Sequence, residues 1–329
     1  MVTNLEELVR RYVEDRDAVR AVFRWENDCM YPVSAQVFLA ADRPVDRERL
    51  ERCRDLVKST TGIFSNFRGN VRLPLVCMLA AGDEPEARWA RTQQTYARLK
   101  ETFFGSEYLA LAALFLSDGT QGEDGAARGR GLYQRMKKEH PFLTGPEDSV
   151  FALILAQSSR TDDELIEDME ASYRLLRERF PQGDGLQSAS HVLALSEAAP
   201  AEKVRRLIAL FDGILAAGGK YGKDRQLPIL AALSLGPEDT DDLVRGLMDL
   251  DGLLSEEKGY KGLFGLDRRT RMMHAAMLLS LPDRGDGQQR VMNAAAQQAT
   301  LAIIIAQQAV ICAAVAASAA SGAAAGSAH

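Results

Sequence analysis

Several residue types are scarce in this chain, and each shortage argues against a class of protein. The 329 residues include only four cysteines, which lie far apart and form no CxxC pair. A disulfide-stapled domain or a zinc ribbon is therefore not expected, and the cysteines are predicted to be free thiols in a reducing cytoplasm. The four histidines are scattered and no HExxH motif occurs, so we expect no metal site and no cofactor.

An excess of positive charge is also missing. The chain has 46 acidic and 40 basic residues and a formal net charge of −6, which argues against a nucleic-acid partner. Its first residues lack the basic and apolar regions of a secretory signal, so the expected location is cytoplasmic. The uncharged stretch Leu301–Ala320 is long enough to cross a bilayer, but it holds few strongly apolar residues and includes Gln307 and Gln308. A membrane is therefore not the expected partner.

The chain is instead rich in alanine and leucine, which form short apolar runs about forty residues apart. Seven such runs end at residues 41, 81, 116, 156, 195, 235 and 280. Longer charged segments lie between them, and in 161–180 the apolar residues are spaced three or four apart, as on one face of a helix. An amphipathic outer helix paired with a buried inner helix is typical of helical repeats. We predict an all-α fold, an α/α solenoid-like stack of about seven helical hairpins.

Two of these units match closely. Residues 72–82 (RLPLVCMLAAG) align with residues 226–236 (QLPILAALSLG), including the proline near the start and the glycine at the end. The offset of 154 residues corresponds to four units of about 38. In an open stack, units four apart would lie roughly 40 Å from each other, at about 10 Å per helix layer, whereas in a closed ring they could converge. The sequence leaves both arrangements open.

The composition changes near residue 283, so the chain is predicted to have two parts. Residues 1–283 form the helical-repeat domain, and residues 284–329 form a polar linker followed by a long, uncharged, Ala-rich C-terminal helix with a frayed end. We expect this helix to dock on the repeats or to mediate self-association.

The loops that enter the inner helices share an aromatic residue, a glycine and several polar residues. Equivalent loops lie along one edge of a stack, and loops commonly carry function. If the loops 64–70 and 220–225 bind an anionic ligand, the candidate residues are Asn66, Arg68, Tyr221, Lys223, Asp224 and Arg225. No catalytic residue is proposed, because the spacing of a nucleophile elbow or a P-loop is absent and His191 and His274 fall within predicted helices.

The same segments are similar to those of a known protein family. Residues 64–70 (FSNFRGN) and 220–233 (KYGKDRQLPILAAL), together with the Ala/Gln-rich tail, resemble an uncharacterised bacterial family of domains of unknown function, the 4003-type. The resemblance covers most of the chain in segment order. It implies a bacterial, cytoplasmic, helical protein and carries over no activity.

Three functions remain as hypotheses. The first is a non-enzymatic interaction scaffold that binds an unknown protein or peptide, as helical-repeat surfaces do. The alternative is a small-molecule binding protein, or an enzyme, that holds an anionic ligand at the loop edge around 64–70 and 220–225. The second alternative is membrane association through the C-terminal helix.

Overall fold

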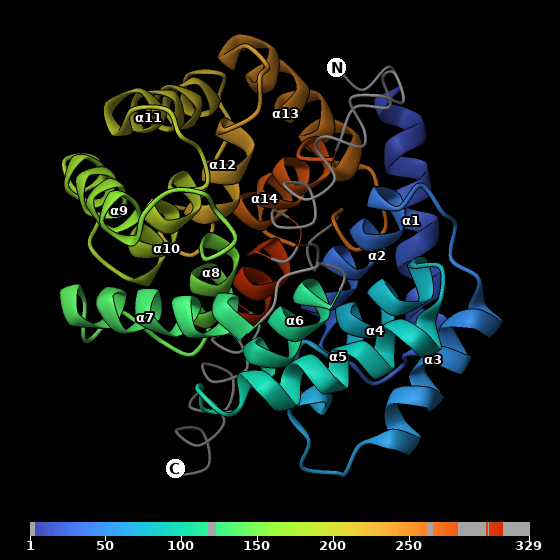
Figure 1. The fold of residues 1–329 in the computed structure, drawn as a ribbon. Coiled ribbons are helices and arrows are strands. Elements are labelled where there is room, and N and C mark those ends of the chain that lie inside the picture. The colour runs from blue at the N-terminus through green and yellow to red at the C-terminus, as the bar shows by residue number, and fades with distance from the viewer. Residues whose placement is uncertain (1–3, 118–122, 262–265, 282–300, 302, 312–329) are drawn as a thin grey trace, which may run out of the picture.

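The computed structural model describes residues 4–117, 123–261, 266–281, 301 and 303–311 (Figure 1). Within these ranges the regular structure is helical and contains no strand, which confirms the all-α prediction. Seven outer helices alternate along the chain with seven shorter inner helices. The outer helices are α1 (Leu5–Val22), α3 (Arg47–Thr60), α5 (Pro85–Leu99), α7 (Glu123–Glu139), α9 (Asp162–Leu176), α11 (Pro200–Ala216) and α13 (Thr240–Ser255). The inner helices are α2 (Tyr31–Ala40), α4 (Arg72–Ala81), α6 (Glu107–Leu116), α8 (Asp148–Leu155), α10 (Asp184–Leu193), α12 (Leu227–Ser234) and α14 (Arg268–Leu279).

Local chemistry explains why these helices form where they do. At the start of α9, the Thr161 side chain accepts a hydrogen bond from the Glu164 backbone, and the Glu164 carboxylate accepts one from the Thr161 N–H at 2.7 Å. This capping box satisfies two N–H groups that the helix itself leaves unpaired. The inner helix α4 is buried from Leu73 to Ala81, and Pro228 lies in the first turn of α12, where a missing N–H is tolerated. The predicted division into amphipathic outer helices and enclosed inner helices is present.

The last hairpin returns to the first. Helix α13 contacts α1, and α14 contacts α2. Hydrogen bonds between distant residues hold this closure: the hydroxyls of Tyr12 and Tyr260 are 2.8 Å apart, and the Gln36 amide donates to the Met277 carbonyl. The hairpins therefore form a ring, as Figure 1 shows, and not an open solenoid.

The two edges of this ring differ in chemistry. Because outer and inner helices alternate, the inner helices run in one direction, and their C-terminal ends share one edge. There Arg49, Arg128 and Arg206 of the outer helices donate to carbonyls at the ends of α4, α8 and α12. Cations are favourable at helix C-termini. The other edge carries the N-terminal ends of the inner helices and the loops that were predicted to bind a ligand.

Residues 303–311 are helical and are enclosed by the ring. Each side chain from Ile303 to Ala309 is 2% exposed or less, so this segment is buried on all sides. The Gln308 amide donates to the Cys29 carbonyl at 2.9 Å, and Figure 1 shows the red segment inside the ring. Of the predicted linker and C-terminal helix, residues 284–329, the structure describes residues 301 and 303–311, and the others lie outside the described residues. None of the helices in the described ranges is long and apolar enough to cross a bilayer.

The cysteines depart in part from the prediction. Cys53 and Cys77 are free and buried, but Cys29 is disulfide-bonded, so the expectation of four free thiols is wrong at that position. Burial raises the pKa of the Cys53 thiol to about 11.

Candidate functional site

Three of the six residues proposed from the sequence make structural hydrogen bonds: Arg68 and Tyr221 bond within their own loops, and Asn66 ties its loop to α5. Asn66 donates to the Tyr96 hydroxyl at 2.6 Å, and Arg68 donates to the Thr61 carbonyl at 2.7 Å. Tyr221 is 3% exposed, and its hydroxyl donates to the Gln226 carbonyl at 3.1 Å. These groups satisfy backbone and side-chain partners that the fold has buried.

The other three residues differ in position. Lys223 is exposed and lies over the Phe211 ring, with Nζ 5.9 Å from the centroid. The exposed Asp224 accepts from the Gly185 N–H at 3.3 Å, whereas the half-buried Arg225 donates to the carbonyl of Val310 in the enclosed segment at 3.4 Å. Among the described residues, no hydrogen bond or ion pair joins the 64–70 loop to the 220–225 loop. Of the six, Arg225 is therefore the residue that reaches the interior of the ring.

Carboxylates gather where the inner helices begin. Glu107, Asp148 and Asp184 occupy the first positions of α6, α8 and α10, and Glu147 immediately precedes α8. Acidic side chains are favourable at helix N-termini, which explains each residue locally. Because the ring points these N-termini toward a shared edge, it also brings Glu147 and Asp184 close enough to Arg225 for its charge to act on both.

A buried polar cluster lies next to these acids. The Asp148 carboxylate accepts from the Gly145 N–H at 2.8 Å, and its other oxygen, Oδ1, lies 3.2 Å from His191 Nδ1. Both side chains are 2% exposed, yet neither of these two facing atoms makes a hydrogen bond of good geometry with a described residue. Gln187, in the same cluster, donates to the Thr144 hydroxyl at 2.8 Å, but its oxygen has no partner among the described residues.

Burial and neighbouring charges shift the pKa values of two acids in this cluster. Burial is the largest cause that raises the pKa of Glu147 to about 7, with the neighbouring charges of Asp148 and Asp184 adding to it and Arg225 opposing it. Burial also raises the pKa of Asp184, where Arg225 again opposes the shift. A carboxyl group with a pKa near 7 can either donate or accept a proton at neutral pH.

Two tyrosines on neighbouring helices experience the same charges. Burial raises the pKa of Tyr108 on α6 and of Tyr133 on α7, and the negative charge of Glu147 adds to both shifts. Their hydroxyls therefore stay protonated at neutral pH and are available to donate hydrogen bonds. Arg225 also acts on Tyr108, which links the start of α6 electrostatically to the start of α12 across the ring.

We call this group the carboxyl site and define it by six residues: Glu147, Asp148, Asp184, Gln187, His191 and Arg225. Within the described parts of the chain, no group of three or more His, Cys, Asp or Glu side chains is arranged to hold a metal ion. The site combines acceptors for a cationic or hydroxyl-bearing ligand with one proton-exchanging carboxyl. Apart from Arg225, the sequence did not single out these residues as ligand contacts, because each acid is explained locally by its helix start and His191 by burial within a helix.

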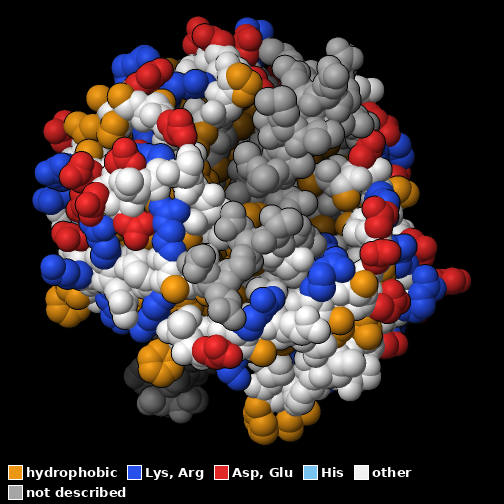
Figure 2. Space-filling view, viewed as in Figure 1, with side chains coloured by type: hydrophobic (Ala, Val, Ile, Leu, Met, Phe, Trp, Pro, Cys, Tyr) orange, Lys and Arg blue, Asp and Glu red, His pale blue; other side chains and the backbone are white. Residues whose placement is uncertain are grey.

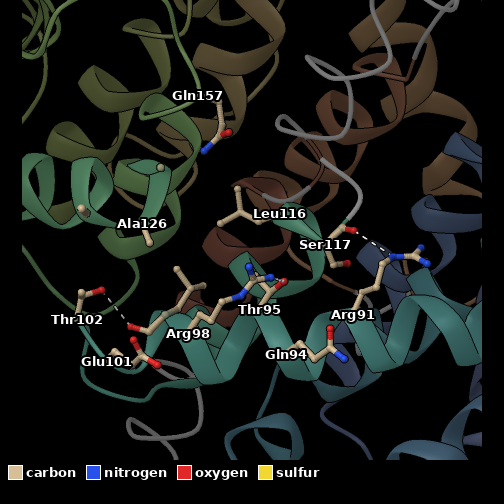
Figure 3. A pocket seen from close by; sticks show the side chains of 13 residues that line it. Arg91, Gln94, Thr95, Arg98, Glu101, Thr102, Leu116, Ser117, Ala126 and Gln157 are labelled. Carbon is tan, nitrogen blue, oxygen red and sulfur yellow. Dashed lines mark hydrogen bonds between the residues drawn. The ribbon is translucent and has the colours of Figure 1, made fainter. Parts of the chain in front are cut away.

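A cleft lies between α5 and α7 (Figure 3). This cleft has a volume of about 440 Å³ and is lined by the exposed side chains of Arg91, Gln94 and Arg98, with Leu116 toward its floor. Arg91 donates to the Ser117 carbonyl at 3.3 Å, as Figure 3 shows. The polar side chains that line the cleft are mostly exposed to solvent, so the cleft makes a weaker ligand site than the buried cluster.

The fold and the carboxyl site define an all-α protein built as a ring of helical hairpins with an acidic inner edge. The chain belongs to a family of proteins of unknown function, DUF4003, whose family model matches residues 17–309. It is similar to the uncharacterised protein YeaA of Bacillus subtilis (strain 168), with 26% identity over 271 residues that cover 78% of this chain and 80% of the relative. No solved structure matches it. The resemblance found in the sequence is thereby confirmed.

Proposed function

We propose that this protein binds a small molecule bearing amino and hydroxyl groups at the carboxyl site. The observation that carries the proposal is the grouping of Glu147, Asp148 and Asp184 around Arg225, beside the buried Gln187 Oε1, which has no hydrogen-bond partner among the described residues. Folded proteins pair nearly all of their buried polar atoms, and exceptions call for an explanation. A ligand with a hydrogen-bond donor would supply a partner for Gln187 Oε1.

The balance of charge favours a cationic ligand over an anionic one. Glu147, Asp148 and Asp184 are three acids around a single arginine, Arg225. An anion placed beside Arg225 would also face these carboxylates, whereas an amine would be attracted to them. The carboxyl site thus supports the small-molecule alternative, with the sign of the ligand charge reversed.

The scaffold hypothesis has less support. A solenoid binds partners through an extended concave surface, and in the ring the enclosed segment 303–311 occupies inner space that such a surface would need. Binding of a protein or peptide and self-association through the C-terminal helix stay proposals of lower rank. The net charge of −6 continues to favour a partner other than nucleic acid.

The test is a calorimetric titration of the purified full-length protein with putrescine and glucosamine, and with glucose and inorganic phosphate as comparison ligands. We expect an amine to bind and Asp184→Asn to weaken that binding by about 10- to 100-fold, the loss of one charge-assisted hydrogen bond. Glu178→Gln, which removes an exposed carboxylate beyond the end of α9, is the matched control and should leave the affinity unchanged. Tighter binding of phosphate than of either amine, or amine binding that survives Asp184→Asn, would overturn the proposal.

A further inference from the structure

Four consecutive loops between outer and inner helices each present a fully exposed aromatic side chain. Trp25, Phe64, Phe104 and Phe142 are 97%, 95%, 91% and 98% exposed. They recur at intervals of 38 to 40 residues, which is the spacing of the hairpins. The same loops also carry aromatic residues that are buried between hairpins, such as Phe67 and Phe103, so packing does not account for the exposed ones.

Contacts place the first three of these loops next to one another. Trp25 and Arg68 line the same pocket of about 280 Å³, which joins the first loop to the second. A Cβ atom on Gly105 would lie 2.9 Å from the side-chain nitrogen of Asn66, so the third loop touches the second. We call Trp25, Ile63, Phe64 and Phe104 the aromatic edge. Figure 2 shows hydrophobic side chains standing out at the lower margin of the molecule, where the loop between α3 and α4 lies in Figure 1.

The pocket beside Trp25 is positively charged. Its lining includes two acids, and both have ion-pair partners: Glu26 pairs with Arg72, and Asp55 pairs with Arg54 at 2.9 Å. The remaining charged side chains that line it are all cationic: Arg24, Lys58 and Arg68. Lys58 is exposed, so its charge is available to an external partner.

We propose that the aromatic edge docks on the surface of a membrane containing anionic phospholipid. Exposed Trp and Phe side chains at loop tips, flanked by Lys and Arg, have the composition that proteins use in the interfacial region of a bilayer. The aromatic rings enter the interface, and the cations around the pocket meet the lipid phosphates. The rings protrude from separate loops, and although Trp25 borders the small pocket, the three rings share no groove among the described residues, which favours a soft lipid surface over a shaped protein partner. This surface is separate from the carboxyl site, and no described residue of the 303–311 segment takes part.

The experiment uses the two tryptophans of the chain. Trp25 is 97% exposed and Trp89 is 2% exposed, so a change in emission on binding reports Trp25. The full-length protein is mixed with phosphatidylcholine vesicles that contain, or lack, phosphatidylserine, and binding is followed by sedimentation and by tryptophan emission. We expect sedimentation with the anionic vesicles together with a blue shift, and Trp25→Phe should abolish the shift while most of the binding remains.

Charge variants separate this mechanism from nonspecific attraction. Lys58→Glu should weaken binding to anionic vesicles by about tenfold or more, because each cation near such a surface contributes appreciably. Arg245→Glu makes the same change of net charge on the exposed surface of α13 and should leave binding unchanged. Phe64→Ser tests the aromatic contribution and should also weaken binding, with thermal unfolding as the check on folding.

Four results would overturn the proposal. They are no sedimentation with anionic vesicles, equal effects of Lys58→Glu and Arg245→Glu, sedimentation without a shift in Trp25 emission, and binding of soluble glycerophosphoserine as tight as binding of vesicles. The last of these would assign the pocket to a free phosphate compound. None of these outcomes depends on an amine binding at the carboxyl site.

Discussion

Replacing Glu147 with glutamine should stabilise the protein at high pH. In the folded protein the pKa of Glu147 is raised from 4.5 to about 7, mainly by burial. The folded state therefore holds a proton between these pH values that the unfolded state has already lost. By linkage, the stability contribution of Glu147 is greatest below pH 4.5 and falls as the pH rises through 7.

The size of the effect follows from the shift. At about 1.4 kcal/mol for each pH unit, a rise from 4.5 to about 7 corresponds to at most roughly 3.5 kcal/mol. Because Glu147 is only partly buried, solvent screening reduces this figure, and we expect about 1–3 kcal/mol. Glutamine cannot ionise, so Glu147→Gln should gain this amount at pH 8.5 and less than about 1 kcal/mol at pH 5.

Urea denaturation of wild type and variant at pH 5 and pH 8.5 measures the difference directly. The control is Glu139→Gln at the exposed end of α7, which should change stability by less than about 0.5 kcal/mol at either pH. Carbon-13 NMR of the glutamate side chains gives the Glu147 titration independently. A titration midpoint near 4.5, or a glutamine variant that gains nothing at pH 8.5, would refute the electrostatic account of this cluster.

Three further predictions concern the buried parts of the ring. Asp168→Asn should destabilise the protein by about 3–5 kcal/mol in urea denaturation, because it leaves the Lys203 ammonium without its counter-charge. This ammonium is 2% exposed and lies 2.7 Å from the Asp168 carboxylate. The double variant Asp168→Asn/Lys203→Met should recover much of the loss. Ile305→Ala should cost about 2–5 kcal/mol if the enclosed segment contributes to the core, while Ile63→Ala, at a position that is 74% exposed, should cost almost nothing. Cys53, whose pKa burial raises to about 11, should react with a thiol reagent at pH 8 far more slowly in the native protein than after unfolding in guanidinium.

Much of the local structure could be predicted because it depends on neighbours in the sequence. The capping box of Thr161 and Glu164 and the apolar face that follows it arise within one helix. The pairing of outer and inner helices arises within one repeat. Closure of the ring depends instead on the small rotation from each hairpin to the next, which a repeat period does not specify. The contact between Tyr12 and Tyr260, 248 residues apart, is a result of that accumulated rotation.

The same reasoning explains why the residues proposed from the sequence differ, apart from Arg225, from those of the carboxyl site. A loop wedged between hairpins must satisfy its own backbone, and Arg68 and Tyr221 do so by donating to nearby carbonyls. The acids at the starts of the inner helices have a sufficient local explanation in the helix dipole, so nothing in one repeat marks Glu147 or Asp184 as part of a site. Once the ring closes, these acids act on one another and on Arg225, and the pKa of Glu147 moves into the range where it can exchange a proton. A site of this kind belongs to the closed ring and not to any single repeat, so a variant that opens the ring should return the pKa of Glu147 toward 4.5 even if every hairpin stays folded.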